Sequence, residues 1–394
     1  MNAWLTSIRR GNLGALPAVA GLIVLCTVFS IMRPSFFTAG NFANLFAQGA
    51  QVTLIAMGLV FVLLLGEIDL SAGFTSGVCA AVLAVTLDQH HFPWYLSISA
   101  AIVTGVVIGL ALGFLVAKLG IPSFVVTLAA FLAFQGVVLL IVKGGKNISV
   151  YDPVIVALAN KNVTPILGWA LAAVAVAGYA AVQVRSTLTR RKQGVTADSW
   201  NLVALRIGSL AVLLGVVVAV LNQERSQNII ISSLKGVPIV GPVIAVFLVI
   251  GTFLLRRTAY GRHLYAVGGN REAARRAGIK VDGIRISAFV ICSAMAAVGG
   301  IIAASRGNSV DPNTGGSNVL LYAVGAAVIG GTSLFGGKGR VLDAVLGGLV
   351  VAVIDNGMGL MGYSAGVKYV VTGTVLLLAA SVDALSRKRA YVSG

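Results

Sequence analysis

Charged side chains are scarce in this 394-residue sequence. They account for 10% of the residues, whereas roughly a quarter of an ordinary soluble domain is charged. Hydrophobic residues, at 58% of the chain, take their place. This composition excludes a protein whose main solvent is water and favours one that is surrounded by lipid.

Cysteine and histidine are almost absent as well, with three residues of each. Cys26, Cys79 and Cys292 lie in apolar runs without CxxC spacing or a neighbouring histidine, which is typical of small packing residues. The pair His90 and His91 has no acidic or cysteine residue at ligand spacing. The sequence therefore predicts no metal site.

A phosphate-binding loop is also missing. The nearest imitation, residues 331–338, has neither the Gly-x-x-x-x-Gly-Lys spacing nor the hydroxyl residue that should follow the lysine. We find no set of nucleophile, base and orienting residue either, which disfavours a membrane-embedded enzyme. We therefore expect no catalytic residue, no bound cofactor and no ATPase site in this chain.

Long apolar runs are what the sequence has instead. A membrane-spanning helix needs about 20 apolar residues, and two of the later runs are short enough to be broken or re-entrant helices. We therefore expect an all-α polytopic membrane protein of about 10–12 transmembrane helices, forming one domain over residues 1–394. The candidate spans are roughly 13–32, 48–66, 71–87, 94–117, 122–142, 164–184, 204–221, 237–255, 284–304, 318–332, 341–355 and 367–383.

Positive charge lies between these runs. The chain has 29 Lys and Arg residues against 12 Asp and Glu, a net charge of +17. A nucleic-acid-binding protein would carry such charge on a polar domain, so no nucleic acid partner is expected. If the amino terminus is cytoplasmic and the loops alternate, most cations fall inside, which favours an even number of spans and two cytoplasmic termini. The inside groups are Arg9 and Arg10, Lys118, residues 185–206, residues 256–285, Lys338 and Arg340, and residues 387–389.

Glycine is abundant, with 48 residues. Gly105, Gly109 and Gly113 lie four residues apart and would form a smooth stripe along one face of a helix. The spacing predicts that a neighbouring helix crosses this stripe at close range.

Two carboxylates, Glu67 and Asp69, stand between two strongly apolar runs in the segment 66–73. Carboxylates at membrane depth are costly and are candidates for function by default. A tight connection in which Asp69 or Ser71 caps the next helix would explain the same residues structurally. The two interpretations are compatible, and the residues alone do not separate them.

The longest basic loop, residues 256–285, contains the signals of a short capped helix. Asn270 is a good N-cap residue, and Glu272 falls in the first turn. Arg275 and Arg276 fall in the last turn, and Gly278 can take the left-handed position beyond it.

One side of this expected helix carries only small residues, Ala273, Ala274 and Ala277. A short helix with a small-residue face and a cationic rim suits docking in a groove of a soluble partner. The alternative is a helix lying on anionic lipid headgroups, for which the apolar face is too small to insert strongly.

Four motifs are specific in combination and weak singly. They are Glu-Ile-Asp-Leu-Ser at 67–71, Tyr-Gly-Arg at 260–262 with its continuation through 266–279, Gly-Gly-Thr-Ser-Leu at 330–334 with Gly336 and Gly337, and Asp-Asn-Gly at 355–357. Through these motifs, and over most of its length, the chain resembles the permease subunits of bacterial ATP-binding-cassette (ABC) sugar importers of the ribose and xylose type.

This resemblance implies a type II ABC importer-like fold in the bacterial inner membrane. It implies that the loop 256–285 seats on a cytoplasmic ATP-binding subunit, which uses the ATP, although the Leu-Pro of the fuller coupling signature is missing. A periplasmic sugar-binding protein and a second copy of the permease are the other implied partners within the lipid bilayer. The candidate coupling residues are Tyr260, Gly261, Asn270, Glu272, Ala273, Ala274, Arg275 and Gly278.

The same resemblance makes Glu67, Asp69, Ser71 and Asn356 candidates for the translocation path or its gates. Residues 160–235 add two spans around a basic stretch at 185–192, and this extra length looks more like the xylose type than the ribose type. An ion-coupled secondary transporter in which Glu67 and Asp69 bind protons or sodium ions is the main rival. A permease for amino acids or other small polar solutes is another.

Overall fold

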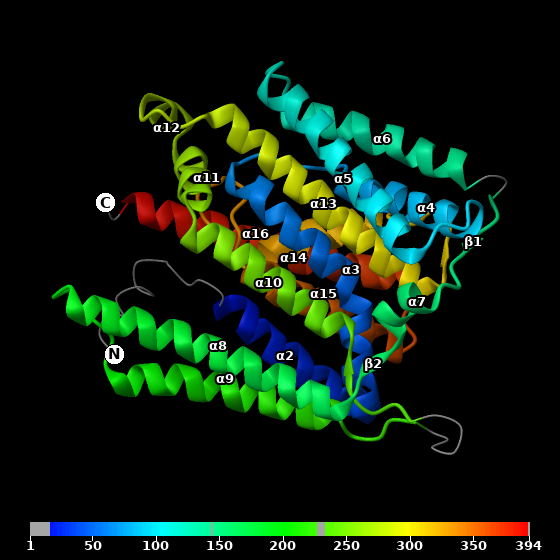
Figure 1. Ribbon diagram of the computed structural model, residues 1–394, viewed down its shortest axis with the longest axis horizontal. Helices are drawn as coiled ribbons and strands as arrows, with labels where there is room; N and C mark the ends of the chain where they lie inside the picture. The colour runs from blue at the N-terminus through cyan, green and yellow to red at the C-terminus, as the bar shows by residue number, and fades with distance from the viewer. Residues whose placement is uncertain (1–15, 143–144, 227–232, 393–394) are drawn as a thin grey trace.

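The computed structural model describes residues 16–142, 145–226 and 233–392, and these are almost entirely helical (Figure 1). The helices are α2 (Leu16–Met32), the 3-10 helix η1 (Pro34–Phe37), α3 (Ala39–Leu64), α4 (Ala72–Asp88), α5 (Trp94–Ala117), α6 (Ser123–Ile141), α7 (Pro153–Asn160), α8 (Pro165–Lys192), α9 (Trp200–Leu221), α10 (Val240–Arg257), α11 (Ala259–Gly269), α12 (Arg271–Arg276), α13 (Val281–Gly307), α14 (Ser317–Ile329), α15 (Val341–Leu360) and α16 (Ala365–Val392). The strands are β1 (Ile148–Ser149), β2 (Asn162–Val163), β3 (Val237–Pro238) and β4 (Ser309–Val310).

The predicted all-α membrane fold is confirmed. Within the described ranges, eight helices are long and apolar enough to cross a membrane, namely α3, α5, α6, α8, α9, α10, α13 and α15. Four shorter apolar helices, α2, α4, α14 and the first part of α16, fall on the remaining candidate runs. The runs expected to be short are α14 and α15, of which α15 is a full-length helix and α14 has 13 residues.

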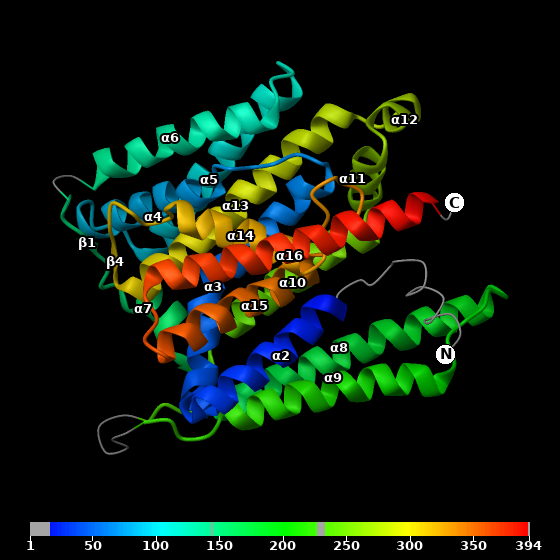
Figure 2. The ribbon, with the colours of Figure 1, turned by 180° about the vertical axis from the view of Figure 1, so that it is seen from behind.

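Helix α3 lies at the centre of the bundle. In its most apolar stretch 83% of the residues are buried, because residues 54–64 are apolar on every side and other helices surround them. The helices α13 and α15 pack against α3 and are the next most enclosed. By contrast, α8 and α9 form a pair at the outer edge, beside α2 (Figures 1 and 2), with only 6% and 11% of their apolar stretches buried.

The close helix crossing predicted from the glycine stripe is confirmed, since α5 packs along α13. A Cβ atom on Gly105 would lie 2.7 Å from the carbonyl oxygen of Ser293, and one on Gly109 would lie 2.6 Å from the Cα of Val290. Real Cβ atoms almost never come closer than 3.0 Å to such atoms. The two backbones therefore approach to a distance that a larger residue would prevent.

The two ends of the bundle differ. One end, here called the α12 end, carries α11, α12, the α8–α9 connection and the last turns of α16 (Figures 1 and 2). The other, the sheet end, carries two short antiparallel strand pairs, β1 with β4 and β2 with β3. The basic last turns of α8 and α10 and the basic helix α12 all lie at the α12 end. The predicted inside residues Arg9 and Arg10 lie outside the described residues.

Candidate functional site

Three of the four sequence motifs meet at the α12 end, around the carbonyl group of Leu64 at the end of α3. The amide of Gly337, in the glycine-rich segment after α14, donates a hydrogen bond of 2.8 Å to this carbonyl oxygen. A Cβ atom on Gly268, near the end of α11, would lie 1.8 Å from the same oxygen. Only residues without side chains allow these three segments to come together. This contact places the start of α12 next to the segment that holds Glu67.

The start of α11 is fixed by equally close packing. A Cβ atom on Gly261 would lie 2.1 Å from the carbonyl oxygen of Leu255, so α11 turns back tightly against the end of α10. The Tyr260 hydroxyl lies 3.2 Å from the Ser287 hydroxyl on α13, and burial raises the pKa of Tyr260. The tyrosine therefore stays protonated and ties α11 to α13.

Helix α12 is the capped helix that the sequence predicts. The side chain of Asn270 accepts a hydrogen bond of 2.9 Å from the amide of Ala273, which is N-capping geometry. Gly278 has a φ of +81°, its amide donates to the carbonyl of Arg275, and the next amide reaches back to Ala274. This double closure is a Schellman motif, and it ends the helix where the sequence indicates.

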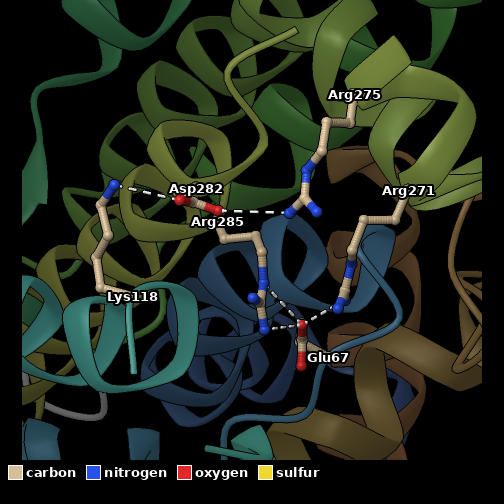
Figure 3. A network of polar contacts seen from close by, with 6 residues as sticks. All are labelled: Glu67, Lys118, Arg271, Arg275, Asp282 and Arg285. Atoms are coloured by element: carbon tan, nitrogen blue, oxygen red, sulfur yellow. Dashed lines mark hydrogen bonds and ion pairs between the residues drawn. The ribbon is translucent and has the colours of Figure 1, made fainter. Parts of the chain in front are cut away.

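The side chains divide α12 into an inner and an outer face. Ala274 is buried against the rest of the protein, whereas Ala273 is exposed. Glu272 and Arg276 pair with each other at 3.3 Å and remain 62% and 79% exposed, so they form the outer face. Arg271 lies four residues before Arg275, and both point inward to acidic partners (Figure 3). Of the expected cationic rim, Arg275 therefore pairs with an acidic residue of the same chain, and Arg276 remains on the outer face.

Glu67 is the centre of an ion-pair network (Figure 3). One carboxylate oxygen, Oε1, accepts hydrogen bonds from Arg285 Nη2 at 2.7 Å, Arg285 Nε at 3.0 Å and Arg271 Nη2 at 2.6 Å. The Glu67 and Arg285 side chains are 8% and 10% exposed, and that of Arg271 is 45% exposed. The buried glutamate and Arg285 neutralise each other, as a buried charge requires. Arg271 adds a second cation from the solvent side.

A second acidic residue holds the other arginine of the inner face. Asp282, in the first turn of α13, pairs with Lys118 at the end of α5 at 3.2 Å and with Arg275 at 4.0 Å (Figure 3). These side chains are one-third to two-thirds exposed. Exposed pairs of this kind contribute little to stability, so the contact of Arg271 with the buried carboxylate of Glu67 is the stronger of the two.

Residues 66–71 connect α3 to α4 without helical structure. Asp69 is fully buried, and its Oδ1 accepts hydrogen bonds from the amide of Ser71 at 2.9 Å and from its hydroxyl at 2.6 Å. The other carboxylate oxygen has no hydrogen-bond partner among the described residues. The Ile68 backbone bonds to the hydroxyls of Ser123 and Thr127 on α6. Such side-chain partners allow irregular backbone within a membrane protein.

This connection runs inward along α13. Glu67 pairs with Arg285, and the Asp69 carboxyl group lies against the thiol of Cys292. These two α13 residues are seven positions apart, which corresponds to about 10 Å along a helix. The chain therefore passes from the water-accessible α12 end into the interior before α4 begins at Ala72.

Asn356, the fourth candidate path residue, lies near the other end of α3. It exchanges two hydrogen bonds of 2.9 Å with Asn41 and donates a third, of 3.0 Å, to Gln48. Asn41 and Asn356 are buried. The structure therefore brings Glu67, Asp69 and Ser71 together and places Asn356 apart from them, in a separate amide cluster.

Sequence reasoning did not identify Arg271 and Arg285 as the partners of Glu67. Arg285 was placed only among the cations of the basic loop, although it lies in the second turn of the apolar helix α13. An arginine just inside an apolar run, together with a glutamate just after another, is a usable signal, because a buried charge needs a partner of opposite sign. Asn41 and Gln48 could have been found in the same way as amides inside an apolar helix.

Apolar helices long enough to cross a membrane around an enclosed central helix, an irregular connection entering the bundle and a short capped helix at one end define a polytopic membrane protein. The comparison with protein families agrees, because residues 41–380 match the branched-chain amino acid transport system / permease component family, and the chain belongs to this family. It is a multi-pass protein of the bacterial inner membrane.

Individual relatives are similar over nearly their whole length. The xylose transport system permease protein XylH of Escherichia coli (strain K12) is 33% identical over 386 residues, covering 98% of this chain and 95% of the relative. The protein of the same name from Haemophilus influenzae (strain Rd) is 32% identical over 97% of this chain and 99% of the relative. The ribose import permease protein RbsC of E. coli (strain K12) is 28% identical over 93% of this chain and 92% of the relative. No solved structure is significantly similar.

Proposed function

We propose that this chain is the transmembrane permease subunit of an ABC importer that carries a monosaccharide, a pentose such as xylose, into the bacterial cell. The observation that carries this proposal is the end-to-end similarity to a xylose transport system permease, at 33% identity over 98% of the chain. The meeting of three motifs at the capped helix α12 supports the same function, since such a helix suits docking to a soluble partner.

In this proposal the α12 end faces the cytoplasm, and the outer face of α12 seats on an ATP-binding subunit that hydrolyses the ATP. The sheet end faces the periplasm, where a sugar-binding protein delivers the sugar. Two copies of the permease form the pathway, and movements of the ATP-binding subunits open it alternately to each side. The chain itself holds no cofactor. The gathering of basic turns at the α12 end supports this orientation.

The environment of Glu67 disfavours ion coupling at this residue. Glu67 contacts two arginines, so its negative charge is already compensated and does not require a sodium ion or a proton. Asp69 and Ser71 lie further inside and remain our candidates for the path or its gates. Asn356, in the amide cluster near the opposite end of α3, is a candidate for a gate on the periplasmic side.

Reconstitution tests the proposal. The permease is placed in proteoliposomes with an ATP-binding subunit and a sugar-binding protein from the same organism, and uptake of radiolabelled xylose is measured with and without internal ATP. We expect uptake to need ATP and to be insensitive to an uncoupler. Uptake that proceeds without ATP and is abolished by an uncoupler would refute the importer and support the ion-coupled rival. ATP-dependent uptake of another pentose, but not of xylose, would correct only the identity of the sugar.

The docking face is tested separately with a matched pair of variants. Ala273→Arg places a large charged side chain on the outer face of α12, where the native residue is exposed. Gln193→Arg adds the same charge in the α8–α9 connection, at the same end of the molecule but away from α12. We expect the ATP-binding subunit to be lost on purification from the first variant and retained by the second. Equal retention would exclude α12 as the docking helix.

A further inference from the structure

We propose that the contact between Arg271 and Glu67 is a releasable link through which α12 acts on the α3–α4 connection, and that Glu67 and Arg271 are positioning residues for transport. This inference rests on the proposed function, in which an ATP-binding subunit docks on α12 and its movement is transmitted into the bundle. In this inference Glu67 helps to couple α12 to the bundle and does not line the sugar path.

The link can break without leaving a buried charge unpaired. Glu67 and Arg285 are both about nine-tenths buried and together carry no net charge. If Arg271 moves away, that neutral pair persists, and the arginine, already 45% exposed, passes into water. Removing Arg285 instead would leave a buried glutamate held by one peripheral cation. The network therefore contains a permanent contact to α13 and a detachable contact to α12.

The position of Glu67 gives the link a route into the bundle. Arg271 is the first residue of α12, and the glycine contacts at Leu64 keep the end of α11 against the end of α3. Glu67 is the second residue of the connection that descends along α13 from Arg285 to Cys292. The next residue with a buried carboxylate, Asp69, lies three residues before the start of α4 at Ala72. A displacement of α12 is therefore transmitted to the start of α4 through the non-helical residues 68–71.

The experiment compares two arginines that differ in the burial of their partners. Arg271 pairs with buried Glu67 at 2.6 Å and is 45% exposed. Arg206, in α9, pairs with Asp198 at 2.7 Å and is 42% exposed, but Asp198 is itself 37% exposed. The variants R271Q, R271K, R206Q, E67Q and the double variant E67Q/R271Q are reconstituted with the ATP-binding subunit and the sugar-binding protein. Sugar carried per ATP hydrolysed is measured, which does not change when only the amount of folded protein changes.

We expect R271Q to retain the ATP-binding subunit and its hydrolysis while the sugar carried per ATP falls about tenfold, the change that corresponds to about 1.4 kcal/mol. R271K should recover most of the loss, and R206Q should equal the unaltered protein. The double variant should be no worse than E67Q alone, because E67Q already removes the partner of Arg271. If E67Q does not fold, R271Q alone decides, since in it Glu67 keeps Arg285.

Three results would overturn the inference. The first is a normal sugar-to-ATP ratio in R271Q. The second is loss of the ATP-binding subunit from R271Q, which would make Arg271 a direct docking contact. The third is additive losses in the double variant. Failure of the proposed function looks different, because the unaltered protein would then show no ATP-dependent uptake, and the inference would fall with it.

Discussion

Adding one methyl group to Gly268 should displace α11 and α12 from the end of α3. The new Cβ atom would lie 1.8 Å from the carbonyl oxygen of Leu64, and closest approaches in proteins begin near 3.0 Å, so a shift of about 1.2 Å or more is needed. The carbonyl cannot simply swing aside, because it accepts the hydrogen bond from Gly337. Overpacking of this size costs about 1–3 kcal/mol, and losing the hydrogen bond adds about 0.5–1.5 kcal/mol.

The adjacent Gly269 provides a matched control. A Cβ atom on Gly269 would meet nothing within 4 Å, so Gly269→Ala should be neutral or stabilise the end of α11 by up to about 1 kcal/mol. The purified permease is heated in detergent, and the midpoint of unfolding is compared between the two variants. We expect Gly268→Ala to unfold several degrees lower and Gly269→Ala to match the unaltered protein. Equal midpoints would show that the segments at Leu64 are not in the close contact described here.

Three further changes test other parts of the molecule. Gly109→Leu should prevent α5 from packing on α13 and abolish folding of the permease. Gly136→Leu is the control, because a Cβ atom on Gly136 meets nothing within 4 Å. Similar yields of folded protein from the two variants would contradict the close crossing of α5 and α13. Asn356→Leu should lower stability by about 1–3 kcal/mol, seen as a lower unfolding midpoint, because it leaves the amides of two partners unsatisfied. Hydrogen bonds from the Ser233 hydroxyl and from nearby backbone amides lower the pKa of Glu224 to about 2. These hydrogen bonds therefore stabilise the loop before β3 fully above about pH 4.5, and the stabilisation is lost as the pH falls through about 2. Hydrogen exchange in this loop should therefore, after correction for intrinsic rates, change little between pH 7 and pH 4.5, and Glu224→Gln should exchange faster at both values.

The helices and the caps were predictable because their signals are local. An apolar run of about 20 residues marks a span wherever it occurs, and the signals at Asn270 and Gly278 define a helix of only 6 residues correctly. The ion-pair partners of Glu67 were not predictable in this way, because they lie 204 and 218 residues away along the chain. Which residues meet at such distances depends on how the helices pack.

Hydropathy also could not tell the central helix from the outermost ones. Helices α3 and α8 both appear in the sequence as long apolar runs, yet 83% of one stretch and 6% of the other are buried by protein. Lipid tails and apolar side chains are similar surroundings for a leucine or valine, so a helix that is apolar on every side fits both places. Hydropathy likewise does not show whether Asp69 and Asn356 line a path, so their roles in the path or its gates stay predictions.

The peripheral position of α8 and α9 has an evolutionary consequence. A lipid-facing surface demands only that its residues be apolar, whereas the surface of α3 must fit the shape of each neighbouring helix. We therefore expect relatives of this permease to exchange alanine, valine, leucine and isoleucine freely along α8 and α9 and rarely along α3. The apolar part of α8, residues 165–184, is about 30 Å long and matches a hydrocarbon core of about 30 Å, whereas the last turns of the helix are basic. The thickness of the host membrane would then select the length of this apolar part.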